Sequence, residues 1–324
     1  MPADTDVAAR SGFRETLRSI ARRLWRPVHD RLPTRITRYV RVMAWISLSV
    51  QIGIVGTGGL VRLTGSGLGC PTWPRCTEDS FVAVPEMGLH GAIEFGNRVL
   101  TFVLVAVAIL MFLAVVRMRA ERRDLFWLSF AVAMYVPVQA ILGGITVLTQ
   151  LNPYVVGLHY FASVPLVGLA AVLVHRVYAV PGPRVRAVPA WYAVVTHLMT
   201  FAMLFTVVVG ILTTGAGPHA GDSGAARNGL DPELMYHVHS WPAYALFALT
   251  AVLVVGGRRL PTRPWAVLLL AVEVVQIVVG VWQARTHVEH IWMVNVHMVL
   301  AVVLVAAAVA VVLHLKRPVQ TPSA

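Results

Sequence analysis

Three histidines lie within long apolar stretches of the sequence, where a polar ring needs a partner. They are His159 in LNPYVVGLHY, His239 in ELMYHVHSW and His297 in WMVNVHMVLAV. Each follows the start of its apolar stretch by six or seven residues, which in a helix is a depth of about 10 Å. A single such histidine is most simply a hydrogen-bonded structural residue. Three at one depth indicate imidazoles that bind a ligand.

The ligand class follows from how imidazoles bind metals. Two imidazoles from facing helices of a four-helix bundle can hold a haem iron from both sides, while the apolar helix walls hold the macrocycle. Zinc would require a closer tetrahedral cluster with cysteine or carboxylate ligands. We therefore expect haem. His237 competes with His239 for the ligand role, and we favour His239 because it lies deeper and matches the depth of His297.

A carboxylate and two cysteines could also take part in chemistry near this level. Glu94 in IEFGNR either pairs with Arg98 one turn later or handles protons for the reaction. Cys70 and Cys76 are the only cysteines, and both precede Glu94 in a segment outside the apolar stretches. Thiols outside the membrane are commonly oxidised, so a disulfide that clamps this segment is expected. A redox role in passing electrons is the alternative.

The elements that carry these residues are predicted from composition. The chain has 324 residues, of which 57% are hydrophobic and only 13% charged, so it has too few charges for the surface of a soluble domain. The net charge of +12 comes from arginines in short connections between apolar stretches. No basic and aromatic face is present for nucleic acid. The sequence therefore predicts an integral membrane protein without a nucleic-acid partner.

A helix needs about 20 apolar residues to cross a bilayer, and eight stretches qualify. We predict an all-α fold with spans at 42–61, 93–116, 125–148, 153–174, 191–212, 235–255, 265–284 and 291–313. Arginine-rich segments fall in alternate connections, at 117–123, 175–186, 257–263 and 315–317. The positive-inside tendency makes this side cytoplasmic, together with both termini. The acids among the first 41 residues argue against a mitochondrial presequence, so we expect a bacterial plasma membrane.

The chain also contains an internal similarity. Aligning 139–164 with 276–302 matches a glutamine, a glycine and a histidine in each segment, which predicts two repeat-related four-helix bundles. The expected division is a cytoplasmic basic amphipathic segment at 1–41, an N-terminal half at 42–176, a C-terminal half at 187–315 and a cytoplasmic tail at 316–324.

Four motifs resemble those of the heme A synthase family. They are TGSGLGCPTWPRC (64–76), IEFGNR (93–98), LGGITVLTQLNPYVVGLH (142–159) and VNVHMVLAV (294–302). The resemblance covers nearly all of 42–313. It implies an oxidoreductase that oxidises the C8 methyl of heme O to the formyl group of heme A through successive hydroxylations. It also implies a bound heme b in the second half and the substrate haem in the first.

The resemblance assigns roles to individual residues. His239 and His297 would be the axial ligands of heme b, His159 would face the substrate haem, and Glu94 would be the functional acid. At Asn97 the family usually has a histidine, so this chain lacks one expected ligand.

Two explanations remain open for the missing ligand. Either His159 alone holds the substrate iron, or His90, which shares a helical face with Glu94 and Asn97, also takes part. We favour the first, because an open iron position suits oxygen chemistry. The expected substrate-haem pocket comprises Asn97, Arg98 and His90.

The expected partners are the lipid bilayer, heme O, an unidentified electron donor and, as a candidate, heme O synthase (protoheme farnesyltransferase). Two other functions remain alternatives. A diheme b-type membrane electron carrier would also show paired histidines, but it would not need Glu94 or the TGSGLGC segment. A transporter is suggested by the internal duplication alone.

Overall fold

The computed structural model describes residues 23, 26–27, 29–286 and 290–319. Within them, eight helices are long and apolar enough to cross a membrane, which confirms the prediction of an all-α membrane protein with eight spans. Each contains or closely matches a predicted span. They are α2 (Arg38–Leu63), α3 (Gly88–Val116), α4 (Arg123–Leu148), α5 (Pro153–Tyr178), α6 (Ala190–Ala216), α7 (Pro232–Gly256), α8 (Arg263–Thr286) and α9 (Ile291–Leu313).

Capping residues fix where α5 and α7, two of the three histidine-bearing helices, begin. Asn152 precedes Pro153, and its side chain accepts hydrogen bonds from the first turn of α5. Asp231 precedes Pro232 in the same way and accepts a hydrogen bond from Leu234. Proline is favoured in the first turn because it has no N–H to leave unsatisfied, and Asn or Asp caps the donors that follow. These starts determine the depth of every later residue on each helix.

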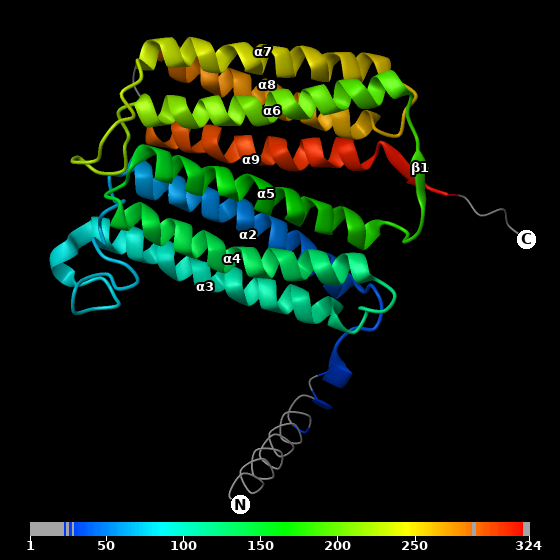
Figure 1. Ribbon diagram of the computed structural model, residues 1–324, viewed down its shortest axis with the longest axis horizontal. Helices are drawn as coiled ribbons and strands as arrows, with labels where there is room; N and C mark the ends of the chain where they lie inside the picture. The colour runs from blue at the N-terminus through cyan, green and yellow to red at the C-terminus, as the bar shows by residue number, and fades with distance from the viewer. Residues whose placement is uncertain (1–22, 24–25, 28, 287–289, 320–324) are drawn as a thin grey trace, which may run out of the picture.

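The eight helices form two rings of four, one above the other in Figure 1. In the first ring α2 packs on α3, α3 on α4, α4 on α5, and α5 on α2. In the second ring α6, α7, α8 and α9 pack in the same cyclic order. The rings meet through contacts of α2 and α5 with α9, and of α5 with α6. The origin of the rings as repeats stays a prediction.

The two ends of the molecule differ in packing. The two largest clusters of buried apolar residues, around Leu125 in the first ring and Leu269 in the second, lie toward the end where α2 begins and α9 ends. We call this the arginine-rich end, because the α3–α4, α5–α6 and α7–α8 connections there carry seven of the nine arginines that lie in connections between the membrane helices. His159, His239 and His297 lie toward the opposite end, which we call the histidine end. In each ring, apolar side chains therefore fill the space between the histidines and the arginine-rich end.

Short elements complete the fold. A 3₁₀ turn, η1 (Pro85–Met87), precedes α3. Strand β1 (Arg184–Arg186), in the α5–α6 connection, pairs antiparallel with β2 (Lys316–Pro318), which follows α9. This ribbon was not predicted, and it joins the connection between the two rings to the tail. Most of the N-terminal segment predicted at 1–41 and the end of the tail at 320–324 lie outside the described residues.

Candidate functional site

Two histidines face each other across the second ring. His239 comes from α7 and His297 from α9, two helices that are diagonal in the ring because each packs on α6 and α8. Their ring centroids are 6.2 Å apart, with an interplanar angle of 73°. Both rings are half-buried. The chain thus presents two imidazoles to the centre of one four-helix ring.

Glycines make room for these imidazoles. A Cβ atom on Gly210 of α6 would lie 2.8 Å from Cε1 of His239, and one on Gly280 of α8 would lie 3.1 Å from Cε1 of His297. A larger side chain at Gly210 would therefore displace the His239 ring. Beside these glycines, the Gln276 side chain donates a hydrogen bond of 3.0 Å to the His297 carbonyl. The helices α6 and α8 thereby fit closely against the two histidines.

The geometry of this pair fits a bound haem. Two metal–nitrogen bonds of about 2.0 Å on opposite sides of one ion place two imidazole centroids about 6 Å apart, as observed for His239 and His297. The Nδ1 atoms of both rings are buried, and neither has a hydrogen-bond partner among the described residues. Among the residues that the structure describes, no group of three or more His, Cys, Asp or Glu gathers in a way that could hold a bare metal ion. The donor set therefore suits a ligand that brings its own iron.

The first ring presents one histidine in a similar setting. His159 of α5 lies against Gly143 of α4, where an added Cβ would be 3.4 Å from the His159 Cε1 atom. Its Nδ1 atom is buried without a hydrogen-bond partner among the described residues. The side chain of Gln139 donates to Ser163 at 2.8 Å and lies 3.5 Å from the His159 carbonyl. The glutamine and glycine predicted to match Gln276 and Gly280 thus contact the matching histidine.

Asn97 lies at the position diagonal to His159, and its side chain already has a hydrogen-bond partner. Asn97 of α3 accepts a hydrogen bond of 2.8 Å from the Thr57 hydroxyl of α2. His90 lies seven residues earlier on α3, which is about 10 Å along the helix axis. The His90 ring is exposed, and its Nδ1 atom is hydrogen-bonded to the Ser66 hydroxyl at 2.9 Å. His90 therefore lies in the first turn of α3 and not at the level of His159.

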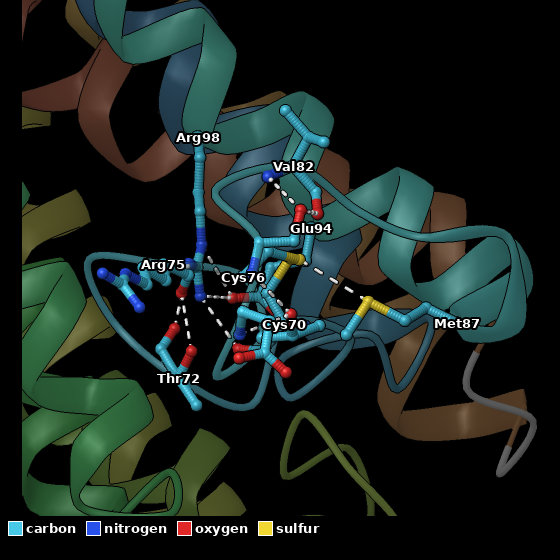
Figure 2. Close-up of a disulfide and its surroundings, with 11 residues drawn as sticks. Cys70, Thr72, Arg75, Cys76, Val82, Met87, Glu94 and Arg98 are labelled. Carbon is cyan, nitrogen blue, oxygen red and sulfur yellow. Dashed lines mark hydrogen bonds and ion pairs between the residues drawn. A yellow bond between two sulfur atoms is a disulfide. The ribbon is translucent and has the colours of Figure 1, made fainter.

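The segment between α2 and α3 forms a loop held by a disulfide. Cys70 and Cys76 are bonded to each other, and both are fully buried. We call residues 64–84 the cysteine loop. Buried Glu94 of α3 holds the cysteine loop in place, because its Oε2 accepts a hydrogen bond of 2.6 Å from the Cys70 N–H (Figure 2). The disulfide expected from the sequence is thus present.

Arg98 also holds the cysteine loop. It pairs with Glu94 at 2.5 Å, as the spacing of one helical turn predicts. Its guanidinium also donates to the Cys70 carbonyl at 2.9 Å, the Thr72 carbonyl at 3.0 Å and the Arg75 carbonyl at 3.1 Å (Figure 2). One side chain on α3 therefore holds three backbone carbonyls of the cysteine loop.

The cysteine loop reaches the first ring near His159. Trp73 packs so closely on Gly144 that a Cβ atom there would overlap the indole, and a Cβ atom on the preceding residue, Gly143, would contact the His159 ring. Trp73 was not among the predicted site residues. The Gly143-Gly144 pair is the signal that could have found it, because adjacent glycines allow close approach on two faces of a helix.

The remaining predicted candidate lies apart from these groups. His237 is exposed, whereas His239 is half-buried and faces His297. Two residues apart on a helix, their side chains point in different directions. The geometry brings His239, and not His237, into the second ring.

Comparison with known proteins places this arrangement in a family. Residues 41–309 match the family COX15-CtaA, described as cytochrome oxidase assembly protein. The chain belongs to this family. The match covers all eight membrane helices except the ends of α2 and α9, so both histidine-bearing rings lie within it.

Individual relatives are similar over shorter segments. The chain is 32% identical over 139 residues to a heme A synthase from Bacillus pumilus, covering 41% of this chain and 43% of the relative. It is 30% identical over 125 residues to one from Geobacillus thermodenitrificans, covering 37% of each. It is 24% identical over 176 residues to one from Lysinibacillus sphaericus, covering 51% of this chain and 57% of the relative. The matches thus span about half the length of these relatives, or less.

Proposed function

We propose that this protein is a heme A synthase, which oxidises the C8 methyl group of heme O to a formyl group for cytochrome oxidase. The observation that carries the proposal is the pair of imidazoles 6.2 Å apart in the second ring, in a chain that belongs to a cytochrome oxidase assembly family. The similarity to relatives named heme A synthase supports this activity. The proposed route is two successive hydroxylations with O2 as the oxidant, after which the resulting diol loses water to give the formyl group. Each hydroxylation puts one oxygen atom of O2 on the carbon and reduces the other to water with two electrons and two protons from a donor, so the protein must handle both electrons and protons.

The two rings have different proposed roles. In the second ring, His239 and His297 would hold a resident heme b, which when bound supplies one-electron transfer. In the first ring, His159 would hold the iron of the substrate, heme O. Asn97 opposite is bonded to Thr57 and is a poor iron ligand. This asymmetry supports one saturated haem site for electron transfer and one site with an open position for chemistry.

Orientation in the membrane follows from the charges. We propose that the arginine-rich end faces the cytoplasm of a bacterial cell, because the positive-inside tendency applies to short connections such as 117–122 and 257–262. The cysteine loop then lies outside, where a disulfide is stable. Substrate supply by the membrane enzyme heme O synthase, and electrons from a separate donor, complete the proposed partners.

Glu94 has two proposed roles, which the structure makes separable. Its contacts with Cys70 and Arg98 support a positioning role, since they hold the cysteine loop against the first ring. The predicted role in proton transfer requires an ionisable group at this position. We expect Glu94→Ala to keep the heme b spectrum and to abolish heme A formation.

Glu94→Gln distinguishes the two roles. The amide oxygen of glutamine can still accept the Cys70 N–H, but its NH2 group then faces the donors of Arg98, so a purely positioning role predicts reduced but measurable activity. A role in proton transfer predicts none. Loss of the heme b spectrum together with activity in either variant would count against both roles.

The function itself is tested by pigment extraction. The chain is expressed in a bacterium that makes heme O but has no heme A synthase of its own, and the extracted haems are separated by chromatography. We expect heme A with the native chain and only heme O with His159→Ala. A native chain that binds haem but leaves heme O unchanged would overturn the proposal and favour the diheme electron carrier.

A further inference from the structure

A group of basic side chains lies at the arginine-rich end, where the two rings meet. His175 and Arg176 are near the end of α5, Arg184 is in β1, and His314 directly follows α9. We call these four residues the seam cluster. The rings of His175 and His314 are in edge contact, with centroids 4.8 Å apart. His175 also interacts electrostatically with Arg184 and Arg176. The cluster thus joins the first ring, the connection between the rings and the end of the second ring.

The positive charge of the seam cluster is only partly balanced by the protein. The nearby carboxylate is Asp124, and both its oxygens accept hydrogen bonds of 3.0 Å from Arg122. Within the described residues neither Arg176 nor Arg184 forms an ion pair. The pKa of Arg184 lies below its usual value, first because of burial and next because of the neighbouring Arg176. Two guanidinium groups therefore lie close together, and the carboxylate that interacts with both of them, Asp124, is already hydrogen-bonded to Arg122.

Several nitrogen atoms of this cluster are buried without a partner. They are Nε and Nη2 of Arg184, Nε of Arg176 and Nε2 of His175, none of which has a hydrogen-bond partner among the described residues. Buried charged donors are normally satisfied, because an unmade bond costs the full desolvation of the group. Arginine N–H groups can only donate. The guanidinium nitrogens therefore need a hydrogen-bond acceptor. Because the surrounding side chains are positively charged, we expect that acceptor to be an anion.

The β-ribbon beside the cluster adds a second, independent observation. Arg186 of β1 lies directly opposite Lys316 of β2 in the antiparallel register, and both are exposed. Like charges at directly opposed strand positions are destabilising. An anion bound at this end of the molecule would relieve that repulsion as well.

The depth of the seam cluster identifies the source of the anion. Arg176 lies 23 residues after Pro153, about 35 Å along α5. The hydrocarbon core of a bilayer is about 30 Å thick, so the cluster lies at the level of the lipid headgroups. Phosphate oxygens accept the forked N–H groups of arginine with good geometry. We propose that the seam cluster binds the phosphate group of an anionic phospholipid, which thereby bridges the two rings.

The test is lipid binding by the full-length protein. The purified chain in neutral detergent is titrated with phosphatidylglycerol, phosphatidylcholine or inorganic phosphate, and bound lipid is counted by native mass spectrometry alongside thermal unfolding. The test variant is Arg176→Gln/Arg184→Gln. The control is Arg258→Gln/Arg259→Gln, which removes two exposed arginines of the α7–α8 connection at the same end.

The proposal predicts one retained phosphatidylglycerol molecule that raises the unfolding temperature of the native chain and of the control. In the test variant its affinity should fall about tenfold or more. Because the double variant could fold poorly, Arg184→Lys serves as a second test: it keeps the charge, loses the forked donors and should weaken binding by a smaller factor. Equal binding by the native chain and the test variant, or equal protection by phosphatidylcholine, would overturn the proposal. Protection by inorganic phosphate alone would overturn the lipid assignment.

Discussion

Removal of the Arg98 guanidinium is expected to loosen the cysteine loop. In Arg98→Leu the loop loses the donors to three of its backbone carbonyls, those of Cys70, Thr72 and Arg75. Glu94 also loses its ion-pair partner while remaining only 5% exposed. The Cys70 N–H remains as a donor to Glu94. The loop is therefore weakened rather than released.

The magnitude follows from what the substitution leaves buried. Removing one partner of a buried ion pair costs about 3–5 kcal/mol. The Arg98 side chain is 20% exposed, and Glu94 keeps one hydrogen bond, so the lower end of that range, about 3 kcal/mol, applies. Each 1.4 kcal/mol is about a tenfold change in an equilibrium constant. The opening equilibrium of the loop should therefore shift by about a hundredfold.

The assay is the rate at which the disulfide is reduced. Cys70 and Cys76 are both 0% exposed, so a water-soluble phosphine reaches them only when the loop opens. Purified protein is treated with the phosphine and the new thiols are labelled with a maleimide. We expect Arg98→Leu to react about a hundredfold faster than the native chain. Arg75→Leu, which removes an exposed arginine of the same loop, should react within a few-fold of native. Equal rates for all three proteins would refute the reasoning about Arg98.

Two further predictions concern the second ring. Gly210→Ala should shift the visible spectrum of bound haem or lower the haem content, because the added Cβ would lie 2.8 Å from the His239 ring. The control is Gly58→Ala, which has no atoms within 4 Å of its new Cβ and should leave the spectrum unchanged. Identical spectra for Gly210→Ala and the native chain would contradict the packing argument. Thr250→Val should destabilise the protein by about 1–3 kcal/mol in thermal unfolding, because it removes the 2.7 Å hydrogen bond to buried Glu273. Adding Glu273→Val should restore most of the stability lost in Thr250→Val, since both buried polar groups are then gone. A double variant no more stable than Thr250→Val would show that the pair does not act as proposed.

Much of the fold could be predicted because a bilayer demands long apolar helices. The histidine depths also followed from the sequence, since Asn152-Pro153 and Asp231-Pro232 fix where α5 and α7 begin. The pairing of Glu94 with Arg98 followed from the helical repeat. These features depend on residues close in sequence, or on the thickness of the membrane.

What could not be predicted depends on how helices rotate and where loops run. The bond of Asn97 to Thr57 requires the orientation of α3 against α2, and the bond of Glu94 to the Cys70 N–H requires the path of the loop. Three-residue strands such as β1 and β2 leave no pattern in a connection and a tail. Glu273 is different, because an acid in an apolar helix is a signal in itself. The repeat comparison hides it, since the matching residue of the first half is Val136.

The most direct test of the central claim is the optical spectrum of the purified protein with the site histidines replaced one at a time. The native chain should show the sharp bands of a six-coordinate, low-spin heme b. His239→Ala and His297→Ala should each lose them, while His159→Ala should keep them and fail to make heme A. A low-spin b-type spectrum that survives loss of both His239 and His297 would contradict the account.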